Sequence, residues 1–158
     1  MRTTSSTSFS GPSGRGAISV VLDCSFLSHA TIPSQSTDEA LGALIQLVAS
    51  GTPIIVTDVL VLEFGSLLRK LTNKGMLEAG FAEREFHKLV SMSATTMGVG
   101  TLWGERAFEL ARRLNQSDIF DCAGYVIAQS VGAEFITSDR RFANAARAAN
   151  LPGVRFIA

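Results

Sequence analysis

Short runs rich in Val, Ile and Thr alternate with longer segments of helical character along most of this 158-residue chain. The runs are ISVVL, PIIVT, TTMGV, EFIT and VRFI. Such alternation is typical of β-α-β units, in which helices pack on a parallel sheet. The first run is apolar throughout, as expected of a strand buried on both faces. We therefore predict an α/β fold with a central parallel sheet covered by helices on both faces.

The segments between these runs carry apolar residues at helical spacing. The pattern predicts helices that begin near residue 36 or 37 and end at Gly51, and over about 58–73, 77–91, 103–114, 119–132 and 140–149. The first of these helices carries Leu41, Leu44, Ile45 and Val48 at helical spacing, which is typical of an apolar face. Asp121 is expected in or just after the first turn of the helix that ends at Gly132.

One domain of ordinary size accounts for the length of the chain. Residues 1–16, MRTTSSTSFSGPSGRG, contain Phe9 as their single large apolar side chain and are expected to form a flexible tail. The domain itself is predicted over residues 17–158. Asp23, Asp58 and Glu63 interrupt the most apolar stretches, so we expect no membrane span.

The charge balance gives no sign of indiscriminate binding to nucleic acid. Fourteen basic residues offset fourteen acidic ones, so the formal net charge is zero, and phosphate neutralisation across the surface is not available. Cys24 and Cys122 form neither a CxxC motif nor a zinc-ligand spacing. Two such cysteines suggest a reducing cytosol, and we predict a cytoplasmic protein.

Four acidic residues occupy positions where carboxylates are uncommon. Asp23 follows the first predicted strand, Asp139 follows a later strand, and Glu63 and Asp121 lie within otherwise apolar helices. The carboxyl ends of parallel strands share one edge of a sheet, so Asp23 and Asp139 are expected at the same edge. Glu63 and Asp121 lie in helices that can turn toward that edge and complete the cluster.

Such a cluster requires a cation. Two carboxylates about 4 Å apart repel each other by roughly 4 kcal/mol at an effective dielectric constant of about 20. Hard oxygen ligands without His or Cys favour Mg²⁺ or Mn²⁺, which also bind phosphate oxygens. This chemistry is typical of phosphodiester cleavage, in which the metal ion activates water and stabilises the leaving oxygen.

Each acid also has an ordinary structural interpretation. Asp23 and Asp139 can cap helices, and Asp121 can neutralise the positive end of one. Glu63 can be an exposed helical residue. Asp118 is a candidate helix cap or a secondary metal ligand. The basic residues Arg140, Arg141, Arg112 and Arg113 can hold RNA phosphates or form solvated helix faces.

The segments VVLDCSFL, VLVLEFGSLLRK and IFDCAGYVIAQSVGAEFITSDRRF resemble the PIN-domain nucleases, especially the VapC-type toxins. The resemblance covers nearly everything after residue 16. It implies that Asp23, Glu63, Asp121 and Asp139 are both the catalytic and the metal-binding acids. It also implies that Ser25 and Thr137 or Ser138 support the site. The family often has Asn three residues after the helix acid, whereas this chain has Ser66.

The resemblance further implies an endoribonuclease that depends on Mg²⁺ or Mn²⁺ and acts on RNA as the toxin of a toxin-antitoxin pair. Its expected partners are an antitoxin protein and a second copy in a homodimer. The competing interpretation is a noncatalytic PIN-like module that binds RNA or protein. The residues expected of a receiver domain, a haloacid-type phosphatase, a P-loop or a G-x-G-x-x-G fingerprint are not found in the sequence.

Overall fold

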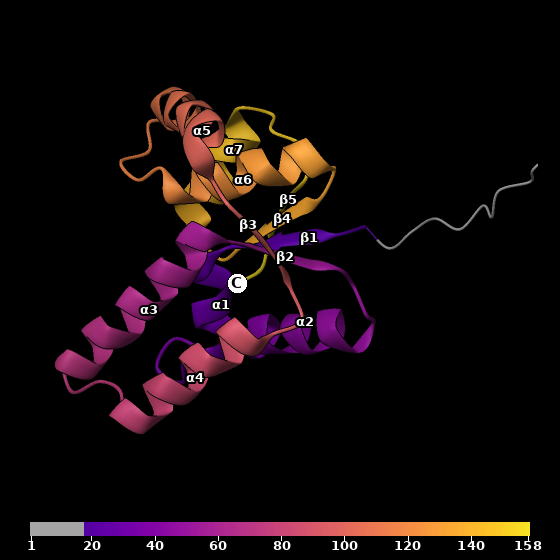
Figure 1. Cartoon of the computed structure of the whole chain (residues 1–158). Helices are drawn as coiled ribbons and strands as arrows, with labels where there is room; N and C mark the ends of the chain where they lie inside the picture. The colour runs from indigo at the N-terminus through magenta and orange to yellow at the C-terminus, as the bar shows by residue number, and fades with distance from the viewer. Residues whose placement is uncertain (1–17) are drawn as a thin grey trace, which may run out of the picture.

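The computed structural model describes residues 18–158, so the predicted tail over residues 1–16 lies outside the described residues. Five strands form one parallel sheet in the order β3-β2-β1-β4-β5 (Figure 1). The strands are β1 (Val20–Leu22), β2 (Ile54–Thr57), β3 (Thr95–Met97), β4 (Glu134–Thr137) and β5 (Val154–Phe156). The predicted α/β fold with a parallel sheet is confirmed.

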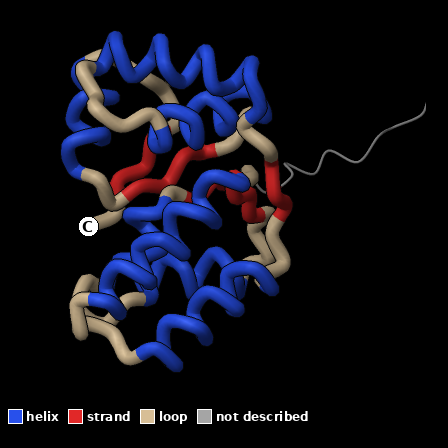
Figure 2. Tube along the Cα trace, turned by 60° about the vertical axis from the view of Figure 1, so that its left-hand side comes forward, coloured by secondary structure: helices blue, strands red, loops and turns tan. Residues whose placement is uncertain are grey.

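Helices cover both faces of the sheet (Figure 2). They are α1 (Cys24–Thr31), α2 (Asp38–Ala49), α3 (Asp58–Asn73), α4 (Ala79–Ser91), α5 (Gly100–Leu114), α6 (Phe120–Val131) and α7 (Arg140–Ala148). The six predicted helices are present, and the bounds of α3 agree with the prediction residue for residue. None of the helices within residues 18–158 combines the length and the apolarity that a membrane span needs.

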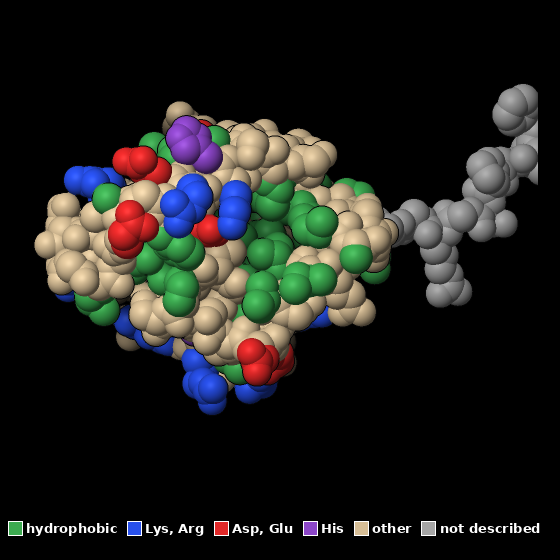
Figure 3. All heavy atoms as spheres, turned by 90° about the horizontal axis from the view of Figure 1, so that it is seen from below, with side chains coloured by type: hydrophobic (Ala, Val, Ile, Leu, Met, Phe, Trp, Pro, Cys, Tyr) green, Lys and Arg blue, Asp and Glu red, His purple; other side chains and the backbone are tan. Residues whose placement is uncertain are grey.

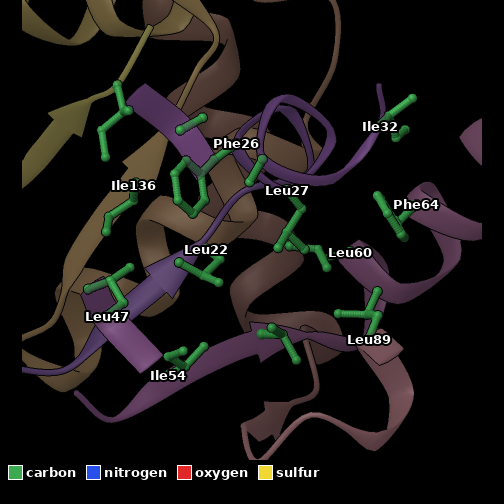
Figure 4. Packing of buried hydrophobic residues seen from close by; sticks show 14 of the residues in the cluster. Leu22, Phe26, Leu27, Ile32, Leu47, Ile54, Leu60, Phe64, Leu89 and Ile136 are labelled. Atoms are coloured by element: carbon green, nitrogen blue, oxygen red, sulfur yellow. The ribbon is translucent and has the colours of Figure 1, made fainter. Parts of the chain in front are cut away.

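Two hydrophobic cores lie on opposite faces of the sheet because side chains alternate along each strand. Val20 and Leu22 of β1 join the core under α1 to α4, whereas Val21 joins the core under α5 to α7. Figure 4 shows the first core, in which Phe26 and Leu27 of α1 pack beside Leu22. Both faces of β1 are therefore buried, as its continuous apolar run predicts.

Helix α1 is not predicted by the apolar pattern of the sequence. It begins directly after β1, and Asp23 caps it by accepting a hydrogen bond from the backbone N–H of Cys24. A helix of eight residues contains barely two turns of apolar spacing, which is too short a pattern to separate from the preceding strand. Asp23 was the sequence signal for the start of this helix, because Asp is a favoured residue at the N-cap position.

The apolar face expected of α2 is buried only in part, because Leu44 alone of its four residues packs against the first core. Leu41, Ile45 and Val48 are 43%, 59% and 59% exposed, and the helix instead buries Ala40 and Leu47. Apolar residues surround this helix on most sides, so their spacing did not distinguish the packed face from the open one. Hydrophobic side chains gather on the face of the molecule seen from below in Figure 3.

Candidate functional site

Asp23 and Asp139 lie where the order of strand addition in the sheet reverses. The chain builds β1, β2 and β3 outward to one side and then places β4 on the other side of β1. Leu22 pairs with Ile136 in the parallel register, so the residues that follow them, Asp23 and Thr137, are neighbours. In open α/β sheets, ligands bind beyond the carboxyl ends of the strands at such a switch point.

Three donors hold the carboxylate of Asp23, which is 4% exposed. The hydroxyl of Thr137 donates to Oδ2 at 2.8 Å, and the hydroxyl of Ser25 donates to the same oxygen. The backbone N–H of Cys24 donates to Oδ1 at 2.8 Å. These bonds orient a buried charged group that would otherwise be costly to remove from water. Ser25 and Thr137, which the resemblance named as supporting residues, both contact Asp23.

Asp139 is fixed at the start of α7. Its Oδ1 accepts hydrogen bonds from the backbone N–H groups of Arg141 and Phe142 at 2.7 and 3.0 Å. Its own backbone N–H donates to the hydroxyl of Thr137 at 2.9 Å. Asp23 and Asp139 are therefore helix caps, as their ordinary interpretation predicted. In both residues the capping bonds set the orientation of a carboxylate at the sheet edge.

Asp121 and Glu63 complete a concentration of negative charge. Burial, followed by the nearby charges of Asp23, Asp139 and Glu63, raises the pKa of Asp121 to about 9. Burial also raises the pKa of Glu63 to about 8, with Asp23 and Asp118 adding to the shift. The structure thus brings all four predicted acids into one electrostatic neighbourhood.

The four carboxylates do not form a preformed metal-binding site. Among residues 18–158, no three His, Cys, Asp or Glu side chains lie in an arrangement that could hold a metal ion. Mg²⁺, however, keeps several waters and takes one or two protein carboxylates, so the Asp23 and Asp121 pair fits its requirements. The raised pKa values of Asp121 and Glu63 indicate that no positive charge compensates these carboxylates when they are ionised.

Asp118 lies beside this cluster at its exposed edge. Its Oδ1 accepts a hydrogen bond of 2.9 Å from the backbone N–H of Phe120, the first residue of α6. This contact agrees with the helix-capping interpretation, although Ile119 occupies the cap position itself. Asp118 also raises the pKa of Glu63, so it adds negative charge to the site.

The two thiols near the site are poor nucleophiles. Burial raises the pKa of Cys24 far above its usual range, and Glu63, Asp23 and Asp121 add to the shift. Burial likewise raises the pKa of Cys122 to about 12, with Asp121 and Asp118 contributing. The thiolate is the reactive form of cysteine, and this negative field disfavours it.

The predicted phosphate-binding arginines have different surroundings. Arg112 pairs with Glu109 at 2.6 Å on α5, so it belongs to a solvated helix face. Arg140 and Arg141 follow Asp139 directly: Arg140 lies over the ring of Phe156, 5.4 Å from its centre. The guanidinium of Arg141 donates to the backbone oxygen of Asn115 at 3.3 Å. Cations thus stand at the same end of the sheet as the carboxylates.

A groove of about 800 Å³ lies between α3 and α4, which diverge from the rest of the molecule in Figure 1. Its lining includes the apolar side chains of Val61, Leu62 and Phe86 and the basic side chains of Arg69 and Lys70. Leu62 precedes Glu63 in α3, but Glu63 itself does not line the groove.

Residues 20–148 match the family model of the PIN domain. The chain belongs to the PIN domain family. This match confirms the family predicted from the sequence, and it spans the four acids described above. A comparison with curated proteins gives no match.

Solved structures with the same fold include PIN domains of toxin-antitoxin systems. VapBC2 from Rickettsia felis, bound to a promoter DNA fragment, has 14% identity and a TM-score of 0.61 over 88% of this chain and 98% of that one. A toxin-antitoxin complex from Klebsiella pneumoniae has 17% identity and a TM-score of 0.58, covering 87% and 96%. VapC20 from Mycobacterium tuberculosis, a toxin that cleaves the sarcin-ricin loop, has 16% identity and a TM-score of 0.58, covering 80% and 95%.

Proposed function

We propose that this PIN domain is a metal-dependent endoribonuclease in which Asp23, Glu63, Asp121 and Asp139 form the catalytic and metal-binding site. One observation carries the proposal: the hydroxyl of Thr137 joins the buried Asp23 to Asp139 at one sheet edge, where burial and the charge of Asp23 also raise the pKa of Asp121 and Glu63. Packing alone gives no reason to gather four acids at a sheet edge, because their mutual repulsion opposes folding. A bound cation supplies the missing reason.

Asp23 and Asp121 would bind Mg²⁺ or Mn²⁺ directly, and Glu63 and Asp139 would complete the negative environment. The metal ion would supply an activated water and stabilise the leaving oxygen of the phosphodiester. Thr137 and Ser25 keep the carboxylate of Asp23 in one orientation, so this ligand need not be ordered when the ion binds. Arg140 and Arg141 stand where they can attract an RNA phosphate toward the acids.

We further propose that the chain is the toxin of a type II toxin-antitoxin pair, active in the cytoplasm as a homodimer. The toxin-antitoxin complexes among its structural neighbours support an antitoxin partner. The groove between α3 and α4 suits an apolar segment of such a partner, and its basic rim favours acidic residues in that segment. Leu62, which lines the groove, precedes Glu63 in α3, so a partner that extends beyond this end of the groove can restrict access to the acids.

The test is cleavage of a mixed RNA pool with Mn²⁺, with a chelator and with the Asp23→Asn variant. Asn keeps the capping ability of residue 23 but removes its charge. We expect metal-dependent cleavage by the unmodified protein and a loss of about a hundredfold or more in the variant, since metal stabilisation supplies several kcal/mol. Asp38→Asn, in the exposed first turn of α2, is the matched control and should cleave normally.

The competing function is a noncatalytic module that binds RNA or protein. Cleavage that survives Asp23→Asn in preparations free of contaminating nuclease would contradict the proposed site. Calorimetry that detected no divalent ion binding would favour the noncatalytic module instead.

A further inference from the structure

Exposed apolar side chains lie in the sequence directly beside the acids of the site. Leu62 precedes Glu63 in α3 and is 72% exposed, while Ile119 and Phe120 precede Asp121 and are 37% and 40% exposed. Single exposed apolar residues are common on proteins. Here, however, each lies within two residues of an acid of the proposed site, and Phe120 is the aromatic residue among them.

Phe120 is unusual among the aromatic residues in the described part of the chain. Only Phe108 and Phe120 are exposed, because Tyr125 is buried and the ring of Trp103 lies under Arg106 at 5.1 Å. Phe108 lies midway along α5 and is 64% exposed, whereas Ala107 and Ala111 of the same helix are buried. Phe120 is thus the exposed aromatic residue that adjoins an acid of the site.

The charge of the protein makes an aromatic contact useful. The net charge is zero, and the acids at the site repel the phosphates of an approaching RNA. Electrostatic attraction over the whole protein is therefore weak, and Arg140 and Arg141 offset the repulsion only locally. Stacking of a base on an aromatic ring does not depend on charge and tolerates any base, because every base has a π-face.

The start of α6 holds Phe120 in place. The backbone N–H of Phe120 donates a hydrogen bond of 2.9 Å to the carboxylate of Asp118. In the preceding loop, the guanidinium of Arg141 donates to the backbone oxygen of Asn115 at 3.3 Å. A ring on a fixed backbone loses little conformational freedom when a base stacks on it. Consecutive Cα atoms are about 3.8 Å apart, so Phe120 and Asp121 occupy adjoining sides of the start of α6, within the span of one nucleotide.

We propose that Phe120 stacks against an unpaired base of single-stranded RNA and thereby positions the neighbouring phosphate at the acids. The inference rests on the proposed nuclease function, since it names a contact to the substrate of that same site. It predicts a preference for single-stranded over double-stranded RNA, because the bases of a duplex are already stacked on one another.

The experiment measures binding of a short fluorescein-labelled single-stranded RNA by anisotropy, in chelator, so that cleavage does not interfere. Phe120→Ala should weaken binding about tenfold, the loss expected for one stacked base, and Phe120→Trp should restore it. Phe108→Ala, the matched exposed phenylalanine, should bind as the unmodified protein does. In cleavage assays, Phe120→Ala should raise KM and leave kcat nearly unchanged.

Unchanged RNA affinity in Phe120→Ala, or absence of RNA binding by the unmodified protein, would overturn the inference. So would a loss of affinity that follows dissociation of a dimer in sedimentation, because Phe120 would then contact a second copy. The two proposals can fail separately. Binding that depends on Phe120 without any cleavage would contradict the nuclease function alone, whereas cleavage with an unchanged KM in Phe120→Ala would contradict the stacking contact alone.

Discussion

Thr137 donates a hydrogen bond of 2.8 Å to Asp23 between the carboxyl ends of two adjacent parallel strands. The same hydroxyl accepts from the backbone N–H of Asp139 at 2.9 Å. One fully buried side chain therefore connects two of the four acids. The relative position of Asp23 and Asp139 depends on this residue as well as on the pairing of β1 with β4.

Replacing Thr137 with Val should damage both stability and metal binding. The substitution keeps the shape but leaves the buried carboxylate of Asp23 without one donor, which costs about 1–3 kcal/mol. Loss of such a supporting contact should also weaken Mn²⁺ binding by roughly 10- to 100-fold. Urea unfolding and calorimetry measure the two effects. Thr137→Ser should retain both properties, and Thr96→Val on exposed β3 should change neither; equal losses in Thr96→Val would contradict the assigned role.

The metal-free protein should lose stability as pH rises from about 4 to about 9. Glu63 and Asp121 have ordinary pKa values of 4.5 and 3.8, which the folded protein raises to about 8 and about 9. Between these values the folded state binds more protons than the unfolded state, so increasing pH favours unfolding. Thermal unfolding in chelator across this range measures the slope.

Mn²⁺ should restore stability mainly at the alkaline end of this range, because the ion binds the ionised carboxylates. Asp121→Asn should flatten the pH dependence in chelator. A melting temperature that rises with pH between 5 and 8 in the metal-free protein would be inconsistent with the raised pKa values.

Gly124 should not tolerate Ala, although Ala is the better helix former. A Cβ atom at this position in α6 would lie 2.7 Å from the ring of Phe135, which is fully buried on β4. Overpacking of this kind costs about 1–3 kcal/mol, which exceeds the gain of about 1 kcal/mol from helix propensity. Gly42→Ala in α2 is the matched control, because no atom lies within 4 Å of its added methyl group. Denaturant unfolding should show opposite signs for the two substitutions, and a stabilised Gly124→Ala protein would refute the packing argument.

The orientation of α2 can be tested by two truncations of similar size. Leu47→Ala removes a buried side chain and should cost about 2–5 kcal/mol of unfolding free energy. Ile45→Ala removes a side chain that is 59% exposed and should change stability by about 0.5 kcal/mol or less. The reverse order of effects in urea unfolding would support the face predicted from the apolar spacing.

The sequence by itself determined the class of fold and the extent of α3, and it singled out four acids that the structure brings near one another. Apolar runs and helical spacing act over a few residues, and acids in apolar segments are visible without knowledge of their neighbours. The order of the strands, the open face of α2 and the contact of Thr137 with Asp23 were decided only by the tertiary structure. The physical reason is that these features depend on which elements pack together. β1 and β4 are separated by more than a hundred residues of chain, yet their pairing brings Asp23, Thr137 and Asp139 to one edge of the sheet.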